Sequence, residues 1–164
     1  MSPNPLCANS ISSYKMYEDN NEAREELKRA DHLIFVTLKY TKTVDVIKNT
    51  IHRLINAYDC GIIFALESLK KQKKLKKIPL TPLSRAEELK RLAARRPEMK
   101  EFLKFYFFLK RIDKAEYTKK EEYRKNVALT VLDNDEVFTI DIERLFEFYK
   151  RTRDFIDFVE AKFR

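Results

Sequence analysis

Glycine and cysteine are scarce in this sequence of 164 residues, and each scarcity excludes a class of protein. Gly61 is the only glycine. Because phosphate-binding loops depend on glycine for their backbone conformation, P-loop and dinucleotide-binding motifs are excluded. Cys7 and Cys60 belong to no CxxC motif or Cys/His cluster, so the sequence indicates neither a zinc site nor a disulfide framework. We expect both cysteines to be unpaired thiols.

Long apolar runs are also missing. No stretch approaches the ~20 residues that a membrane-spanning helix needs. The N-terminal sequence MSPNPLCANSISSYKM lacks the basic start and apolar centre of a secretory signal. We therefore expect a cytoplasmic protein, with a mobile N-terminal tail at residues 1–20 and a single domain at residues 21–164.

Apolar residues recur every three or four positions along most of the chain, which predicts helices. Capping boxes at Ser84 with Glu87 and at Thr118 with Glu121 predict the starts of two short helices. Asp141 is the expected cap of the last helix. The predicted long helices cover residues 21–41, 44–76, 97–112 and 142–163, and the predicted short ones cover residues 85–94 and 118–126.

The periodicity changes from helical to alternating at residues 127–140, which predicts a β-hairpin with its turn in the sequence DNDE. A two-stranded hairpin is marginally stable alone, so it must lie against the helices or be completed by a partner strand. The predicted fold is mainly all-α. It is an antiparallel bundle of four long helices and two short ones, with one β-hairpin near residues 127–140.

Positive charge is concentrated in one segment. Residues 70–100 contain twelve bases and three acids, a charge of +9, whereas the whole chain carries +8. The rest of the protein is therefore close to neutral. The segment contains a basic patch that is a candidate nucleic-acid-binding site, made of Lys70, Lys71, Lys73, Lys74, Lys76, Lys77, Arg91, Arg95 and Arg96.

Two interpretations of the basic patch are open. Clustered bases attract phosphate-bearing polymers through counterion release, which favours RNA or another acidic partner. Alternatively, lysines at a helix C-terminus complement the helix dipole and stay solvated without any ligand. Arg95 and Arg96 lie beyond the predicted helix end, where the dipole does not explain them.

Polar residues also form a stripe on the predicted helix at residues 44–76. They recur at spacings of four, three, four and three, which places them on one helix face. A histidine among carboxylates and carboxamides is suited to proton transfer or metal binding, but a solvated helix face explains the pattern equally well. The polar stripe consists of Asp45, Asn49, His52, Asn56 and Asp59.

His32 follows Asp31, a carboxylate that could orient its imidazole, and it is the only histidine besides His52. No serine or cysteine lies in a recognisable nucleophile motif. We therefore predict no catalytic residue, metal or cofactor. The apolar run Phe102–Leu109 indicates burial on more than one side, with a remaining face that could serve self-association.

The segments ADHLIFVTLKY, RLINAYDCGIIFALESL and FYFFLKRIDKAEYTKKEEYRKNV, with the basic crossover and the final amphipathic helix, together resemble archaeal HEPN-like proteins over residues 22–163. The resemblance implies an up-and-down helical bundle that often dimerises. It also implies either RNA cleavage or a non-catalytic partnership with a nucleotidyltransferase. Catalytic members carry an Arg followed by a His after four to six residues, and neither His32 nor His52 has an Arg at that distance.

The sequence thus predicts a non-catalytic, homodimeric binding protein whose basic patch holds RNA or another acidic partner. A second hypothesis is an interaction subunit of a nucleotidyltransferase, with the lysines serving solubility. A third is a nuclease that uses His32 or His52 outside any known motif.

Overall fold

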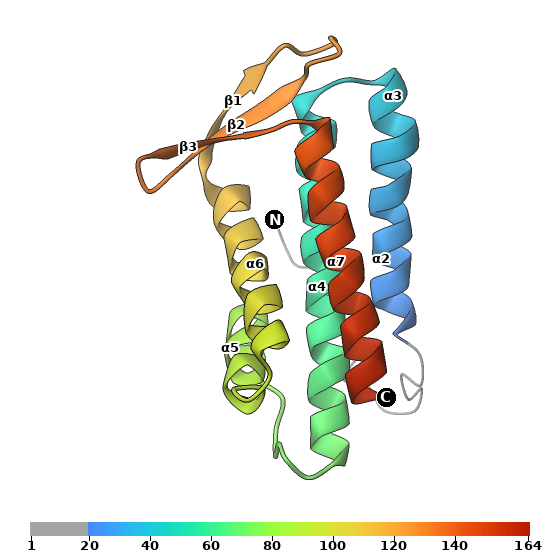
Figure 1. Cartoon of the computed structure of the whole chain (residues 1–164), viewed down its shortest axis with the longest axis vertical. Helices are drawn as coiled ribbons and strands as arrows, with labels where there is room; N and C mark the ends of the chain where they lie inside the picture. The colour runs from blue at the N-terminus through green and yellow to red at the C-terminus, as the bar shows by residue number, and fades with distance from the viewer. Residues whose placement is uncertain (1–19) are drawn as a thin grey trace.

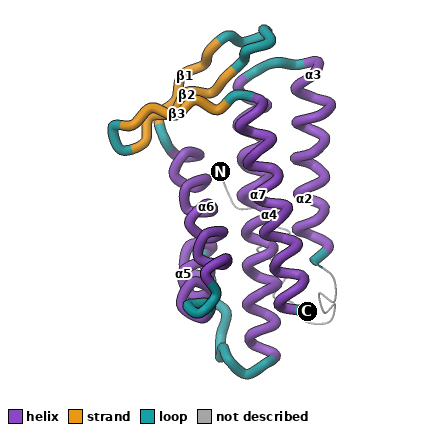
Figure 2. Tube along the Cα trace, viewed as in Figure 1, coloured by secondary structure: helices purple, strands orange, loops and turns teal. Residues whose placement is uncertain are grey.

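The computed structural model describes residues 20–164, and these are mainly helical with a small antiparallel sheet at one end (Figures 1 and 2). Successive long helices alternate in direction along the length of the molecule (Figure 1). The helices are α2 (Asn21–His32), η1 (Leu33–Thr37), α3 (Leu38–Tyr40), α4 (Val44–Lys71), α5 (Pro82–Leu92), α6 (Pro97–Lys114) and α7 (Ile142–Phe163). The strands are β1 (Glu116–Lys120), β2 (Ala128–Asp133) and β3 (Glu136–Ile140).

The central element is α4, which packs against α2, α5, α6 and α7. Its apolar positions, among them Leu54, Ile62 and Leu66, are fully buried. Gly61 allows α7 to approach closely, because a Cβ atom there would lie 2.7 Å from Cε1 of Phe155. The need for a glycine therefore comes from helix packing and not from a turn.

The helix boundaries agree in part with the sequence. Asp141 caps α7 as predicted, since its Oδ1 accepts a hydrogen bond from the backbone N–H of Arg144 at 2.8 Å. The predicted capping box at Ser84 is wrong, because Thr81 is the cap and its Oγ1 accepts from the N–H of Ser84 at 3.2 Å. Pro82 lies in the first turn of α5, and it suits that position because proline has no backbone N–H that would need an acceptor.

The long central helix ends at Lys71, five residues before the predicted end at Lys76. Lys73 has a positive φ of 59°, a left-handed conformation that stops the helix. Its N–H donates to the carbonyl of Lys70 at 3.0 Å and so closes the last turn. The following residues, 72–81, cross over to α5 as a loop, which is where the prolines of IPLTP exclude a helix.

The sheet contains the predicted hairpin and one additional strand. The β2–β3 pairing confirms the hairpin, and Asn134 and Asp135 form its two-residue turn with φ angles of 50° and 64°. Positive φ at both positions matches the right-handed twist of the strands, and Asn and Asp tolerate it better than most residues.

The short helix predicted at residues 118–126 is wrong. Thr118 lies in β1 and pairs with Thr130 of β2, so its side chain does not cap a helix. Glu121 and Tyr123 have positive φ angles, and the N–H of Tyr123 donates to the carbonyl of Lys42 at 2.6 Å. The tertiary hydrogen bonds of the strand and this loop override the local capping signal.

The sheet rests on the helical layer, where β2 contacts α4 and α6. None of the helices in residues 20–164 is long and apolar enough to cross a membrane. Cys60 is disulfide-bonded, so the expectation of an unpaired thiol is wrong at this position. Cys7 and the predicted mobile tail, apart from Asn20, lie outside the described residues.

Candidate functional site

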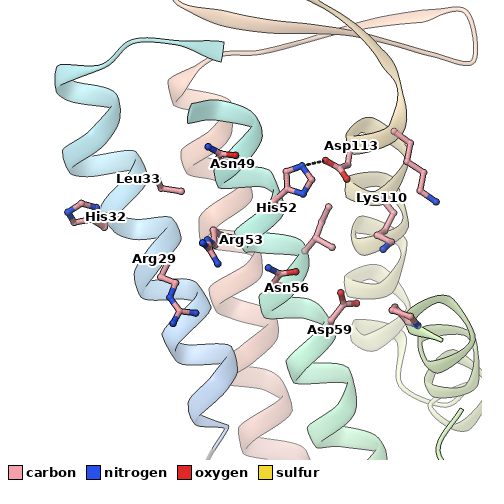
Figure 3. Close-up of a pocket in the computed structure, with 13 residues that line it drawn as sticks. Arg29, His32, Leu33, Asn49, His52, Arg53, Asn56, Asp59, Lys110 and Asp113 are labelled. Atoms are coloured by element: carbon pink, nitrogen blue, oxygen red, sulfur yellow. Dashed lines mark ion pairs between the residues drawn. The ribbon is translucent and has the colours of Figure 1, made fainter. Parts of the chain in front are cut away.

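A groove of about 1140 Å³ runs along α4 between α2 and α6 (Figure 3). It forms because α2 and α6 both pack on α4 and leave the helix face between them uncovered. This face of α4 is open to water, and it carries polar side chains. An apolar surface at this position would be exposed to water. The groove is lined mainly by charged and carboxamide side chains from three helices, with Pro82 contributed by α5.

Four residues of the polar stripe line the groove: Asn49, His52, Asn56 and Asp59. Asp45 does not, because it is exposed at the start of α4, where its Oδ1 lies 3.6 Å from Nζ of Lys119. These four residues therefore share one face of α4, as their spacing predicts. This face lines a groove because α2 and α6 pack on either side of it.

The first feature of the groove wall is a buried carboxylate, Glu26 of α2, which is 1% exposed. Arg29 Nη1 donates to its Oε1, and Arg53 Nη1 donates to its Oε2 at 3.2 Å. Asn56 Nδ2 also donates to Oε2, at 3.4 Å. A buried carboxylate is costly unless it is paired, so Glu26 holds both guanidinium groups in place. Nearly half of each arginine side chain stays exposed.

The second feature is a histidine–carboxylate pair across the groove. His52 Nε2 of α4 lies 2.9 Å from Asp113 Oδ1 of α6 (Figure 3). Burial acts to raise the pKa of Asp113, but the His52 contact and the charges of Lys48 and Lys110 outweigh it and lower the pKa. Asp113 is therefore ionised near neutral pH.

The third feature is a second buried carboxylate, Asp59, which accepts a hydrogen bond from the Tyr106 hydroxyl at 2.5 Å. Burial raises the pKa of Asp59, although the Tyr106 hydrogen bond and the charge of Lys110 oppose the rise. Burial and the charge of Asp59 raise the pKa of Tyr106 in turn. The Tyr106 proton therefore stays on its oxygen and Asp59 keeps its donor.

His32 also lines the groove, whereas its neighbour Asp31 does not. Asp31 acts instead on Tyr149 of α7, whose pKa is raised by burial first and by Asp31 second. The two histidines thus lie along one groove, His32 from α2 and His52 from α4.

The basic patch lies elsewhere, at the end of the molecule opposite the sheet (Figure 1). Lys70 and Lys71 belong to the last turn of α4, and Lys73 to Lys77 follow in the loop. All six lysines of this run are exposed. Within residues 20–164, none of them forms a salt bridge. Their charge is therefore directed at solvent.

The arginines of the basic patch differ from the lysines. Arg91 is bound by Glu88 through its Nε at 3.1 Å, and the Arg96 guanidinium lies 5.1 Å from the centre of the Phe163 ring. Arg95 is exposed. Arg85, counted in the charge of the segment, is buried and donates to the carbonyl of Pro79 at 2.8 Å, so it supports the loop.

Apart from His32, the groove residues outside α4 were not predicted from the sequence. One signal was present for Glu26: it lies three residues after Ala23 and four before Ala30, which places it on the buried stripe of α2. An acid on an apolar stripe needs a partner. Asp113 offered no such signal, because it lies 61 residues from His52 in the chain and only the packing of α6 on α4 joins them.

Comparisons with known proteins add no assignment, since no family model, curated protein or solved structure matches the chain. The resemblance to HEPN-like proteins stays a prediction. Within residues 20–164, no group of three or more His, Cys, Asp or Glu side chains is placed to hold a metal ion.

Proposed function

We propose that the protein is a HEPN-like helical-bundle binding protein that holds RNA through its basic patch. The observation that carries the proposal is the run of six exposed lysines, none of which forms a salt bridge within residues 20–164. Charges that a protein leaves unpaired at one end repel each other and attract a polyanion. Counterion release then favours binding to a phosphate chain.

Helix electrostatics accounts for only part of this run. Lys70 and Lys71 lie in the last turn of α4, where a positive charge complements the helix dipole. Lys73, Lys74, Lys76 and Lys77 follow in a loop that is not helical. The dipole effect falls off beyond the last turn, so these four lysines favour a ligand over a capping role.

The test is a charge reversal with a matched control. Replacing Lys73, Lys74, Lys76 and Lys77 with Glu is expected to weaken binding of a single-stranded RNA, measured by fluorescence anisotropy. The slope of log K against log salt should flatten by about 0.7 for each phosphate that the variant no longer neutralises. Unchanged affinity at low salt would exclude the proposal.

The control variant reverses four other exposed lysines, which lie away from the basic patch. It changes the net charge by the same amount, so it separates a local contact from the general attraction of a basic protein. RNA affinity should fall much less in this variant, and an equal fall would contradict a site at the patch. The control lysines are Lys39, Lys104, Lys120 and Lys125.

A specific observation favours the second hypothesis, a protein-interaction subunit. Phe35, Val36 and Tyr40 are 50%, 42% and 78% exposed, and they lie on or beside the π-helical segment η1. Phe35 also packs edge-on against Phe146 of α7. Exposed apolar groups of this kind mark protein contact sites. A homodimer or a nucleotidyltransferase complex that Phe35→Ser disrupts, while RNA binding persists, would support this function.

A further inference from the structure

The disulfide bond of Cys60 needs a partner that the described residues do not contain. Cys60 of α4 is disulfide-bonded, and it is the only cysteine in residues 20–164. The full sequence contains one further cysteine, Cys7. Within a single chain, Cys7 is therefore the partner that the composition leaves for Cys60.

The start of α2 lies at the same level of the bundle as Cys60. Glu26 of α2 accepts hydrogen bonds from Arg53 and Asn56 of α4, which aligns these parts of the two helices. The two helices run in opposite directions (Figure 1). Asn20 lies six residues before Glu26, which corresponds to about 9 Å along the helix axis. The same rise along α4 leads from Arg53 and Asn56 to Cys60, so the chain that precedes α2 begins beside Cys60.

Beyond Cys60, α4 continues without α2 beside it (Figure 1). Phe64 and Glu67 follow Cys60 at intervals of four and three residues, so the three side chains share the helix face that is directed towards α2. Phe64 is 6% exposed, and burial raises the pKa of Glu67. Because α2 begins at this level, its helix does not cover this part of the face. The chain that precedes Asn20 enters the bundle next to it.

We propose that Cys60 pairs with Cys7 and that this disulfide is a redox-sensitive device that holds an N-terminal strap, residues 1–19, against α4 below the start of α2. Residues 8–19 can extend to about 40 Å, so they reach from α2 back to Cys60 without tension. The proposal does not depend on RNA binding at the basic patch. The strap also contains apolar side chains for the face around Phe64, namely Leu6, Ile11, Tyr14, Met16 and Tyr17.

Release of the strap is a thiol–disulfide exchange with a small dithiol. One thiolate of the dithiol attacks a sulfur of the pair to form a mixed disulfide, and its second thiolate then displaces the protein sulfur. The pair gains two electrons and two protons, and the dithiol leaves as a cyclic disulfide. The reverse exchange with a disulfide oxidant, such as oxidised glutathione, restores the bond. In the cytoplasmic location that we expect, such bonds are transient and serve redox sensing.

Peptide mapping of the full chain, oxidised with oxidised glutathione, tests the pairing directly. Trypsin cleaves after Lys15, Arg53 and Lys70, so the cysteines fall in peptides 1–15 and 54–70. Without reductant, the two peptides should appear as one species that is lighter than their sum by two hydrogen atoms. Two free thiols in the oxidised chain would overturn the proposal. A dimer linked through Cys60 of two copies would overturn it as well.

Melting temperatures measure what the bond does to the fold. The bond closes a loop of about 50 residues and so lowers the entropy of the unfolded chain. We expect the oxidised chain to melt about 10 °C higher than the chain reduced with dithiothreitol. Cys7→Ser should melt with the reduced parent and should not respond to dithiothreitol. Cys60→Ala, which removes the other half of the pair, should also lose the response. A response in either variant, or none in the parent, would contradict the pairing.

The rate of trypsin cleavage after Lys15 separates a docked strap from a bond without docking. Under native conditions, cleavage should be about tenfold faster in the reduced chain, because release exposes the backbone to the protease. Cleavage after Lys74, which lies in an exposed loop, is the control and should keep its rate. Equal rates after Lys15 in the oxidised and reduced chains would overturn the strap even where the disulfide is found.

Discussion

The basic patch and the groove both concentrate positive charge, but they hold it in opposite ways. The lysines of the patch are exposed and form no salt bridge within residues 20–164. In the groove, a buried carboxylate fixes Arg29 and Arg53. Exposed flexible cations suit a long, variable polyanion, whereas anchored guanidinium groups suit one anion in one geometry.

The difference has an energetic side. Exposed lysines have little effect on folding stability, because water and salt screen them. The charges around Glu26 are part of the packing between α2 and α4, so the fold depends on them. Changes in the patch should therefore alter RNA binding without altering stability, and changes around Glu26 should lower stability.

The largest expected effect on stability comes from Glu26→Ala. The substitution leaves Arg29 and Arg53 without their common acceptor and opens a cavity between two helices. We expect a decrease of about 2–3 kcal/mol in the free energy of unfolding, measured by urea denaturation. The partial exposure of both arginines keeps the decrease below that for a fully buried pair.

The adjacent acid provides the control for that change. Glu25→Ala removes the same charge from an exposed position that pairs with Lys28, so the urea midpoint should be essentially unchanged. RNA affinity at the basic patch should persist in both variants. A Glu26→Ala protein as stable as the parent would show that the groove is not built on this carboxylate.

The next effect in size is the pH dependence caused by Asp59. Burial raises the pKa of Asp59 above its ordinary value of 3.8, so the folded state binds its proton more tightly than the unfolded state does. The contribution of Asp59 to stability is therefore greatest in acid, below its ordinary pKa of 3.8, and it falls as the pH rises from there towards neutral. Asp59→Asn should be more stable than the parent by about 1 kcal/mol at neutral pH.

Tyr106 provides the matched comparison for Asp59. Asparagine keeps an acceptor for the Tyr106 hydroxyl, whereas Tyr106→Phe removes the hydrogen bond that the buried Asp59 accepts. Tyr106→Phe should therefore be destabilised at neutral pH and less so in acid. Urea unfolding at several pH values measures the stability of Asp59→Asn and of Tyr106→Phe. The difference in the free energy of unfolding between the parent and Asp59→Asn should shrink as the pH falls. A constant difference would contradict the assigned ionisation of Asp59.

The smallest expected effect is on the melting temperature when the patch is neutralised. Replacing Lys73, Lys74, Lys76 and Lys77 with Gln should change the melting temperature by less than about 2 °C at physiological salt. At low salt the variant should melt slightly higher than the parent, because mutual repulsion among the lysines is relieved. A large decrease would show that these lysines have structural partners.

Much of the fold follows from local patterns. The apolar periodicity located α2, α4, α6 and α7, and the alternation located the β2–β3 hairpin. These predictions succeeded because side-chain periodicity reports directly which face is buried. β1 was missed because residues 118–121 contain a capping box, and strand pairing with β2 outweighed that local preference.

The two candidate regions also differ in how far the sequence predicts them. The basic patch could be found from the sequence, because its six lysines are neighbours in the chain. The groove could not, since Glu26, His52 and Asp113 come from three helices and meet only through packing. Contacts between residues far apart in the chain leave no local pattern to read.

The amino-acid sequence alone determined the helical class, the hairpin turn and the segment that carries the charge, because each depends on neighbouring residues. The tertiary structure decided that the polar stripe faces a groove and that Gly61 serves a close contact with Phe155. It also decided which charges are anchored. Whether a charged side chain is flexible or held in one position depends on the partners that other helices bring into contact with it.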